Sequence, residues 1–379
     1  MTIYLDHTAT TKPSDPVVAC ICDLLTSLYA NPASVHAAGR EAFSRLQADR
    51  RNIATALGCR HQDLILTSGG TEAINLAIKG ILLRPVRLVK RLIISEGEHA
   101  AVLKTAAELE RQDFDVVRLP LTAQGQVSLA ALEEALQQPA GLISLLHVSN
   151  ETGSINPIRE IVDLRNRLQP RTPIHPDAVE TWRKTPFRLS DSSVDLISES
   201  AHKINGPKGI GWLARREGVR LEAQLHGGGQ QNGLRSGTEN PVLAAALAIA
   251  LQQAVQNCDM NSTEVRALRD RFLDQIAASG IPHRVFSPPD SVPHILSIAF
   301  PGLRGETMVN ALSAEGVFIS AGAACSSRRS KGNHVLLAMG VSEPLMRNAV
   351  RVSFAAGNSE AEIDQACQAM ISAYRRLAR

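Results

Sequence analysis

Short apolar segments alternate with longer helix-like segments between residues 64 and 214, and this alternation constrains the fold more than any other feature of the sequence. The apolar segments predict strands at 64–67, 92–95, 115–119, 142–148, 174–176, 194–198 and 210–214. The segments between them predict helices at 71–82, 99–112, 128–137 and 157–168. Such an alternation is typical of an α/β fold in which helices cover a mainly parallel sheet.

The regions on either side predict further helices and a second, smaller α/β unit. A long N-terminal helix at 36–57 is expected to be capped by Ser34 or a neighbour and ended by Gly58. Further helices are predicted at 15–29, from about 239, and at 263–279, 305–315 and 358–377. Further strands are predicted at 295–300, 317–320 and 350–354. We expect the first residues of the chain to pack with this C-terminal unit.

The chain has 379 residues, of which 44% are hydrophobic and 20% charged, as in an ordinary globular protein. Because this length favours two domains, we expect a large domain over 15–255 and a small domain that combines 1–14 with 256–379. The net charge of +3 gives no reason to expect direct binding to nucleic acid or to a membrane surface.

Targeting and redox signals point to the cytoplasm. The longest apolar run, 242–251, is too short and too rich in alanine to span a bilayer. Met1 leads directly into the strand-like segment 3–5, so we expect no signal peptide. The six cysteines are scattered without a CxxC pair, which suggests neither a disulfide framework nor a zinc site. We therefore predict a cytoplasmic protein without a bound metal.

The stretch 198–209 places Ser200, His202 and Lys203 between the end of a predicted strand and a Gly-Pro-Lys-Gly turn. Ligands of α/β proteins bind at the carboxyl ends of strands. A lysine there can be a point charge for phosphate or a nucleophile that forms an imine. A solvated surface lysine is the alternative that this stretch alone leaves open.

The stretch 67–73 joins a strand to a helix through Gly69 and Gly70, with Thr71 at the start of the helix. Free amides and a hydroxyl at a helix N-terminus make a site for an anion such as phosphate. An ordinary helix cap by Thr71 is equally compatible with this pattern. The stretch is neither a Walker loop nor a GxGxxG motif.

Three further polar residues follow strands of the same region. Asp177 suits a partner for a protonated heterocyclic nitrogen or a helix cap. His99 suits stacking on a flat ring or a buried polar role, and Asn150 suits a ring substituent or a turn. An aspartate, a lysine and a phosphate cup together are what pyridoxal 5′-phosphate requires.

Two residues of the C-terminal part carry chemistry. Cys325 follows a strand among small residues, and Arg328 and Arg329 come directly after it, so nearby positive charge favours the reactive thiolate. Arg351 lies in the middle of a predicted strand, where an unpaired charge would be costly. Its forked donors suit a substrate carboxylate or an intramolecular ion pair.

Together these stretches resemble the cysteine desulfurases of the class V aminotransferase family, over nearly the whole chain. The resemblance also rests on the segments 4–11, 31–36, 147–153, 227–230 and 235–240. It implies the pyridoxal-phosphate-dependent fold type I, with a seven-stranded sheet in the large domain. The stretch around Cys325 carries no long insertion after the cysteine and resembles the branch with a long mobile cysteine loop that feeds scaffold proteins.

The resemblance implies a role for each matching residue. Lys203 carries the cofactor, Asp177 faces the pyridine nitrogen and His99 stacks on the ring. The phosphate-binding residues are Gly70, Thr71, Ser200, His202 and, from a second subunit of a homodimer, Thr238. Asn150 and Arg351 bind the carboxylate of L-cysteine. Cys325 takes the sulfur as a persulfide, alanine leaves, and the small domain carries this cysteine.

One position departs from the family pattern. Glu180 stands where the family usually has a glutamine that donates a hydrogen bond to the phenolic oxygen of the cofactor. A carboxylate facing a phenolate is repulsive unless it is protonated. We therefore expect a raised pKa of Glu180, a shifted absorption of the bound cofactor, or weaker activity. His7 and Thr8 are a milder departure, where asparagines are more usual.

Two other functions remain open at this point. The first is a selenocysteine lyase or aminotransferase-like enzyme, although plain transamination needs no thiol. The second is a catalytically weakened homologue that binds a partner. The acceptor of the sulfur is also open among iron–sulfur scaffolds, tRNA thiolation proteins and DNA sulfur-modification proteins. The basic residues 328, 329 and 331 either dock an acidic acceptor or are solvated surface.

Overall fold

The computed structural model describes residues 2–85, 89–181, 187–321 and 333–378. Within these ranges a seven-stranded sheet runs in the order β2-β8-β7-β6-β5-β3-β4. Its strands are β2 (Leu64–Thr67), β3 (Arg91–Ser95), β4 (Asp115–Leu119), β5 (Leu142–Leu146), β6 (Ile174–Asp177), β7 (Leu196–Ser200) and β8 (Gly211–Arg215). The pairs from β7 to β4 are parallel, whereas β8 is antiparallel to both β2 and β7. The predicted α/β fold with a mainly parallel sheet is therefore confirmed.

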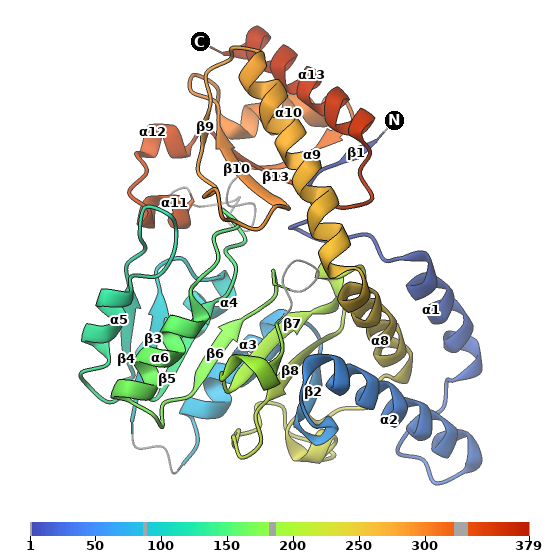
Figure 1. The fold of residues 1–379 in the computed structure, drawn as a ribbon. Helices are drawn as coiled ribbons and strands as arrows, with labels where there is room; N and C mark the ends of the chain where they lie inside the picture. Colours follow the sequence, from blue (N-terminus) through green and yellow to red (C-terminus); the bar gives the residue numbers. More distant parts are fainter. Residues whose placement is uncertain (1, 86–88, 182–186, 322–332, 379) are drawn as a thin grey trace.

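Helices cover both faces of this sheet (Figure 1). They are α1 (Asp15–Ser27), α2 (Ala37–Leu57), α3 (Gly70–Leu82), α4 (Ala100–Glu110), α5 (Leu129–Ala135), α6 (Ile158–Leu168), α7 (Leu189–Ser192) and α8 (Pro241–Gln256), with short 3-10 turns η1 (His61–Asp63), η2 (Ala201–Lys203) and η3 (Gln231–Gly233). Side chains alternate between the faces of a strand. Ile93 accordingly joins the core under α2, α6 and α8, while Leu92 and Ile94 join the core under α3 and α4.

The last third of the chain, from Cys258 on, forms a smaller unit that lies above the large sheet in Figure 1. It contains α9 (Cys258–Ala278), β9 (Arg284–Val285), β10 (Ile295–Ala299), α10 (Gly305–Ala314), β11 (Val317–Phe318), β12 (Ser320–Ala321), α11 (His334–Ala338), α12 (Glu343–Met346), β13 (Ala349–Ser353) and α13 (Glu360–Leu377). Four strands pair in the order β12-β13-β10-β9. The N-terminal strand β1 (Ile3–Tyr4) pairs in parallel with β11, so the first residues of the chain contact the C-terminal unit as expected.

Several element boundaries differ from the prediction. The predicted strand 317–320 is two strands, because β11 pairs with β1 while β12 pairs with β13 in another sheet. The cap of α2 is a neighbour of Ser34, His36, whose Nδ1 accepts from the Gly39 amide. Gly58 does end α2, with a left-handed φ of 69°. A side chain there would also collide with Ser190, since its Cβ would lie 2.4 Å from the hydroxyl oxygen.

By length and apolar composition, no single described helix would cross a bilayer. Helices α8 and α9 are long and apolar enough for a span only if they are counted as one helix, but the chain bends by 69° between them. Nine residues of α8 are buried, and two of them, Leu247 and Leu251, are fully buried in the hydrophobic core of the large sheet.

Candidate active site

A pocket of about 260 Å³ lies at the carboxyl ends of β6 and β7, next to the N-terminus of α3. Its lining residues come from the seven-stranded sheet and from β13 of the four-stranded sheet. Open α/β folds bind ligands at the carboxyl ends of their strands. Ten of the sequence-predicted site residues line it: Gly70, Thr71, His99, Asn150, Asp177, Glu180, Ser200, His202, Lys203 and Arg351. Thr238 is exposed and does not line this pocket, and Cys325 lies outside the described residues.

Lys203 is the last residue of the short η2 turn that directly follows β7, and it therefore lies in the pocket at the carboxyl end of this strand. Its Nζ lies 2.7 Å from Oε1 of Glu180 and also donates to the carbonyl oxygen of Thr8. Glu180 is only 1% exposed, so its carboxylate depends on this cation for compensation. The solvated surface lysine that the sequence left open is therefore excluded, because only 14% of the Lys203 side chain is exposed.

Asp177 is the last residue of β6 and is 1% exposed. Burial raises the pKa of its carboxyl to about 7, against the opposing hydrogen bond from the Val179 amide. The adjacent charge of Glu180 raises this pKa further, and that of Lys203 lowers it. A buried carboxylate with so little compensation would be stabilised by a cationic partner. The protonated nitrogen of a pyridine ring is such a partner, so this residue fits the predicted cofactor.

The N-terminus of α3 contributes Gly70 and Thr71 to the lining of the pocket. Gly70 is its first residue, and it lies so close to the segment after β6 that a Cβ on Gly70 would be 3.0 Å from a side-chain methyl of Val179. Unpaired amides at a helix N-terminus favour a bound anion. The hydroxyls of Thr71 and Ser200 line the same pocket. The arrangement suits a phosphate group.

His99 caps α4, with Nδ1 accepting from the Ala101 amide at 3.1 Å. The ring proton of the neutral histidine therefore lies on Nε2. Burial and the nearby Lys203 charge lower the pKa of His99. His202 is also kept neutral, since burial and the same lysine lower its pKa to about 4. Two uncharged imidazoles thus face the pocket at neutral pH, and a neutral ring is suited to stacking on a flat cofactor.

Arg351 enters the pocket from β13 of the smaller unit. Its Nη1 donates to the Asn150 carbonyl at 2.8 Å, and its Nη2 donates to Asp6 at 3.3 Å. Burial opposes its charge, but the carboxylates of Glu151 and Asp6 outweigh burial and raise the pKa of the guanidinium. Its buried Nε has no hydrogen-bond partner among the described residues. Arg351 thus forms an ion pair with Asp6 and still has one donor, Nε, without a partner among the described residues. This donor fits a carboxylate ligand.

Sequence reasoning missed three acidic residues of this region, Asp6, Glu98 and Glu151. Glu98 is fully buried below His99, and its Oε1 accepts from the Ser95 hydroxyl at 2.6 Å and the Leu146 amide at 3.1 Å. Burial, against these hydrogen bonds, raises the pKa of Glu98 to about 8. The one available signal was adjacency, since Glu98 and Glu151 directly precede or follow predicted site residues in the sequence.

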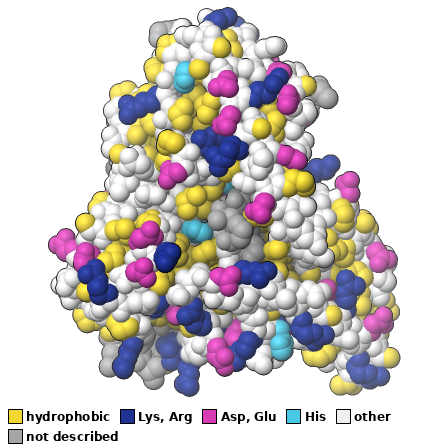
Figure 2. All heavy atoms as spheres, in the orientation of Figure 1, with side chains coloured by type: hydrophobic (Ala, Val, Ile, Leu, Met, Phe, Trp, Pro, Cys, Tyr) yellow, Lys and Arg dark blue, Asp and Glu magenta, His cyan; other side chains and the backbone are white. Residues whose placement is uncertain are grey.

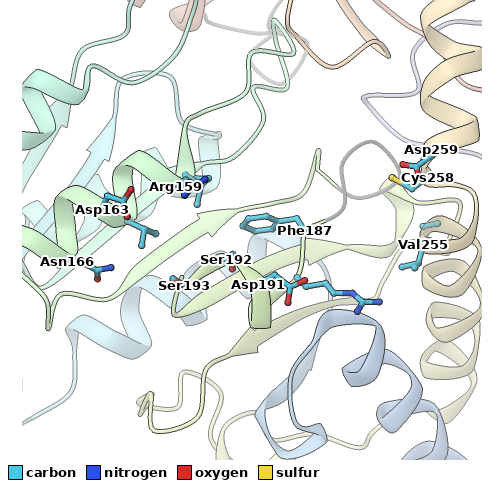
Figure 3. Close-up of a pocket in the computed structure, with 14 residues that line it drawn as sticks. Arg159, Asp163, Asn166, Phe187, Asp191, Ser192, Ser193, Val255, Cys258 and Asp259 are labelled. Carbon is cyan, nitrogen blue, oxygen red and sulfur yellow. The ribbon is translucent and has the colours of Figure 1, made fainter.

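Another groove, of about 770 Å³, lies between α6, α7 and the junction of α8 and α9 (Figure 3). Its lining mixes both charges, with Arg159 and Arg188 facing the same space as Asp163 and Asp191. None of the predicted site residues is among the described residues that line it. Positive and negative side chains also intermingle over the face shown in Figure 2. No group of three or more described His, Cys, Asp or Glu side chains is arranged to hold a metal ion.

Comparisons with known proteins identify the family of the chain. The aminotransferase class-V family matches residues 3–366. A putative cysteine desulfurase, IscS 1 of Bacillus subtilis, is 34% identical over 99% of this chain and 99% of its own length. The cysteine desulfurase IscS of Pseudomonas entomophila is 37% identical over 99% of this chain and 93% of its own length.

Solved structures are also similar over nearly the whole chain. A NifS-like protein is 33% identical, with a TM-score of 0.94 and 100% coverage of both chains. SspA in complex with cysteine is 30% identical, with a TM-score of 0.82, and the match covers 93% of this chain and 99% of SspA. The chain therefore belongs to the aminotransferase class-V family and, within it, to the cysteine desulfurases, which depend on pyridoxal 5′-phosphate.

Proposed function

We propose that the pocket binds pyridoxal 5′-phosphate through Lys203 and that the enzyme transfers the sulfur of L-cysteine to the thiol of Cys325. The observation that carries this proposal is the convergence of a lysine, a buried aspartate and a helix N-terminus in one pocket of about 260 Å³. These three features match the imine-forming amine, the pyridine partner and the phosphate site that the cofactor needs.

Each residue has a binding task in this proposal. Gly70, Thr71, Ser200 and His202 bind the phosphate, Asp177 pairs with the ring nitrogen, and His99 stacks on the ring. Glu180 lies beside Lys203 and faces the phenolic oxygen, with Asn150 close to the ring. Asn150 and the guanidinium of Arg351 bind the carboxylate of L-cysteine, and the available Nε of Arg351 supports this assignment.

The chemistry divides between the cofactor and the chain. The bound cofactor supplies an electron-accepting ring that acidifies the substrate. The Nζ of Lys203 carries protons to and from the substrate carbons, and the neutral Nε2–H of His99 is available for a further transfer. The thiolate of Cys325 attacks the substrate sulfur, so the C–S bond breaks and an S–S bond forms. One L-cysteine and one thiol give one L-alanine and one persulfide, and the thiol proton balances the new C–H bond.

Organisation and partners complete the proposal. We assign 15–255 to a large cofactor-binding domain, and 1–14 with 256–379 to a small domain that carries Cys325. The separate core around β10, β13 and α13 supports this division. The enzyme works as a homodimer in which the exposed Thr238 reaches the phosphate of the second subunit, and its persulfide passes to an acceptor protein. Cys20, Cys22, Cys59 and Cys367 are free thiols, which suits the reducing cytoplasm.

The proposal is tested with purified enzyme, L-cysteine and a reductant that releases persulfide sulfur as sulfide. Wild-type protein is expected to be yellow and to produce alanine and sulfide in equal amounts. Cys325→Ala is expected to keep the colour and lose both products, whereas Lys203→Ala is expected to lose the covalently held cofactor. A colourless wild type, or a Cys325→Ala variant that still forms sulfide at the wild-type rate, would contradict it. L-Selenocysteine assayed in parallel separates a selenocysteine lyase from a desulfurase.

A further inference from the structure

The carboxylate of Glu151 contacts Asn150 and Arg351, at what is called here the substrate end of the pocket. It also contacts Asn333, in the part of the chain that follows Cys325. We propose that Glu151 is a positioning residue for sulfur transfer, which acts by fixing Asn333 relative to Arg351 and Asn150. This inference rests on the function proposed above. It assigns a task to the second oxygen of this buried carboxylate, whose first oxygen lies beside Arg351.

One oxygen of Glu151 faces the substrate end. Its Oε1 accepts from Nδ2 of Asn150 at 3.3 Å and lies 3.8 Å from Nη1 of Arg351. Both partners are the residues assigned to the substrate carboxylate. Because Glu151 is only 6% exposed, its charge has to be compensated by neighbours rather than by water.

The other oxygen faces the C-terminal part of the chain. Oε2 of Glu151 accepts from Nδ2 of Asn333 at 2.8 Å, across 182 positions of sequence. Asn333 is 2% exposed, and its Oδ1 caps α11 by accepting from the amides of Val335 and Leu336 at 3.0 and 3.2 Å. Asn333 therefore has both functional groups of its amide committed, one to a helix and one to Glu151.

Asn333 has a decisive place in the sequence. It is the first described residue after 322–332, the segment that contains Cys325. A second contact lies beside it, since Nε2 of His334 is 3.0 Å from the carbonyl oxygen of Glu98, the residue before His99. The chain leaving that segment is thus attached to the pocket at two adjacent residues, and only the Asn333 attachment depends on a buried charge.

The arrangement predicts that the Glu151–Asn333 bond affects sulfur transfer more than substrate binding. Asn333 touches neither Arg351 nor Asn150 in any hydrogen bond of the described residues. A change at Asn333 should therefore alter kcat and leave the affinity of the carboxylate site unchanged. A structural defect without this role would lower the thermal stability but would not produce such a split.

The test compares N333D, E151Q and the double variant E151Q/N333D in the holoenzyme. N333D keeps the cap of α11 but places two carboxylates face to face. E151Q/N333D exchanges donor and acceptor, so that the amide at 151 donates to the carboxylate at 333. N358D is the matched control, because Asn358 also accepts from a backbone amide and donates to a glutamate, Glu362, at 3.4 Å, but does not line the pocket.

We expect N333D to lower kcat for alanine formation about tenfold, the usual size of one lost charge-assisted hydrogen bond. The affinity for the product L-alanine, measured by calorimetry, should stay within about threefold of wild type. The reason is that Asn333 makes no contact with the bound carboxylate. The double variant should recover most of the lost kcat, and N358D should match wild type.

Three results would overturn the role of Glu151. They are a wild-type kcat in N333D, a double variant no faster than N333D, and a loss of L-alanine affinity that parallels the loss of kcat. None of these three results would contradict the cysteine desulfurase activity. A wild-type enzyme that forms no alanine from L-cysteine would instead refute the function proposed above.

Discussion

Replacing Asp177 with asparagine should have opposite effects on the empty protein and on its complex with the cofactor. Burial raises the pKa of Asp177 from 3.8 to about 7, so the folded state resists its ionisation. Below pH 3.8 the carboxyl is protonated in both folded and unfolded chains, and it costs no stability. Between pH 3.8 and 7 the unfolded chain ionises first, and above pH 7 the full cost is present.

The magnitude follows from the size of this shift. Three pKa units correspond to about 4 kcal/mol, an upper bound for the destabilisation at pH 8 because proteins relax around buried charges. Asparagine has the same shape, carries no charge and can still accept from the Val179 amide, which lies 3.1 Å from Oδ1 of Asp177. Asp177→Asn should therefore unfold at a higher temperature than wild type at pH 8, with the difference vanishing near pH 4.

The assay is thermal unfolding of cofactor-free protein across this pH range, with Asp195→Asn as the control. The Asp195 carboxylate accepts from the Ile174 amide at 2.8 Å and from Arg165 at 3.1 Å, so its replacement should destabilise at pH 8. In the complex the sign reverses, because asparagine cannot neutralise the ring nitrogen, and Asp177→Asn should lose the cofactor faster in dialysis. An Asp177→Asn variant that is no more stable than wild type at pH 8 would refute this reasoning.

Three further predictions concern the pocket. Glu180→Gln should lower, by about one unit, the pH at which the absorption of the bound cofactor changes, because an amide donates to the phenolic oxygen that a carboxylate repels; identical spectra at all pH values would contradict this. Arg351→Lys should raise the KM for L-cysteine about tenfold to hundredfold, which is the cost of one or two charged hydrogen bonds. The control Arg269→Lys on α9 should leave the KM unchanged, and equal KM values in the two variants would exclude the carboxylate role of Arg351. Cys325→Ser should bind L-cysteine and keep its colour but form no persulfide detectable by mass spectrometry, and a persulfide on another cysteine would identify a different acceptor thiol.

The alternating segments were sufficient to predict the large sheet, because strand length and apolar content mark buried strands whatever their direction. The same signal cannot assign direction. Nothing in 210–214 distinguishes an antiparallel strand from a parallel one, and β8 is antiparallel on both sides. Likewise, 317–320 appears continuous in sequence, but its two halves pair with partners from opposite ends of the chain.

The site could be predicted where chemistry is carried by rare residues at strand ends, such as Lys203 and Asp177. The supporting acids were missed because their partners are distant in sequence. Arg351 meets Asp6 across 345 positions and Asn333 meets Glu151 across 182, and such pairings leave no local pattern. The short helices α11 and α12 escaped prediction for a related reason, since tertiary packing rather than propensity maintains helices of so few residues.

The pairing of the first strand with the end of the chain has a consequence for synthesis. The amide of Thr8 bonds to the Ser353 hydroxyl, 345 positions later. At ribosomal rates of about 5 to 20 residues per second, roughly 20 to 70 s separate the emergence of these two partners. Strand β1 has no strand partner until β11, which begins at Val317, has also emerged. A nascent chain stalled before residue 317 should therefore bind chaperones through its first residues and lose that binding once translation finishes.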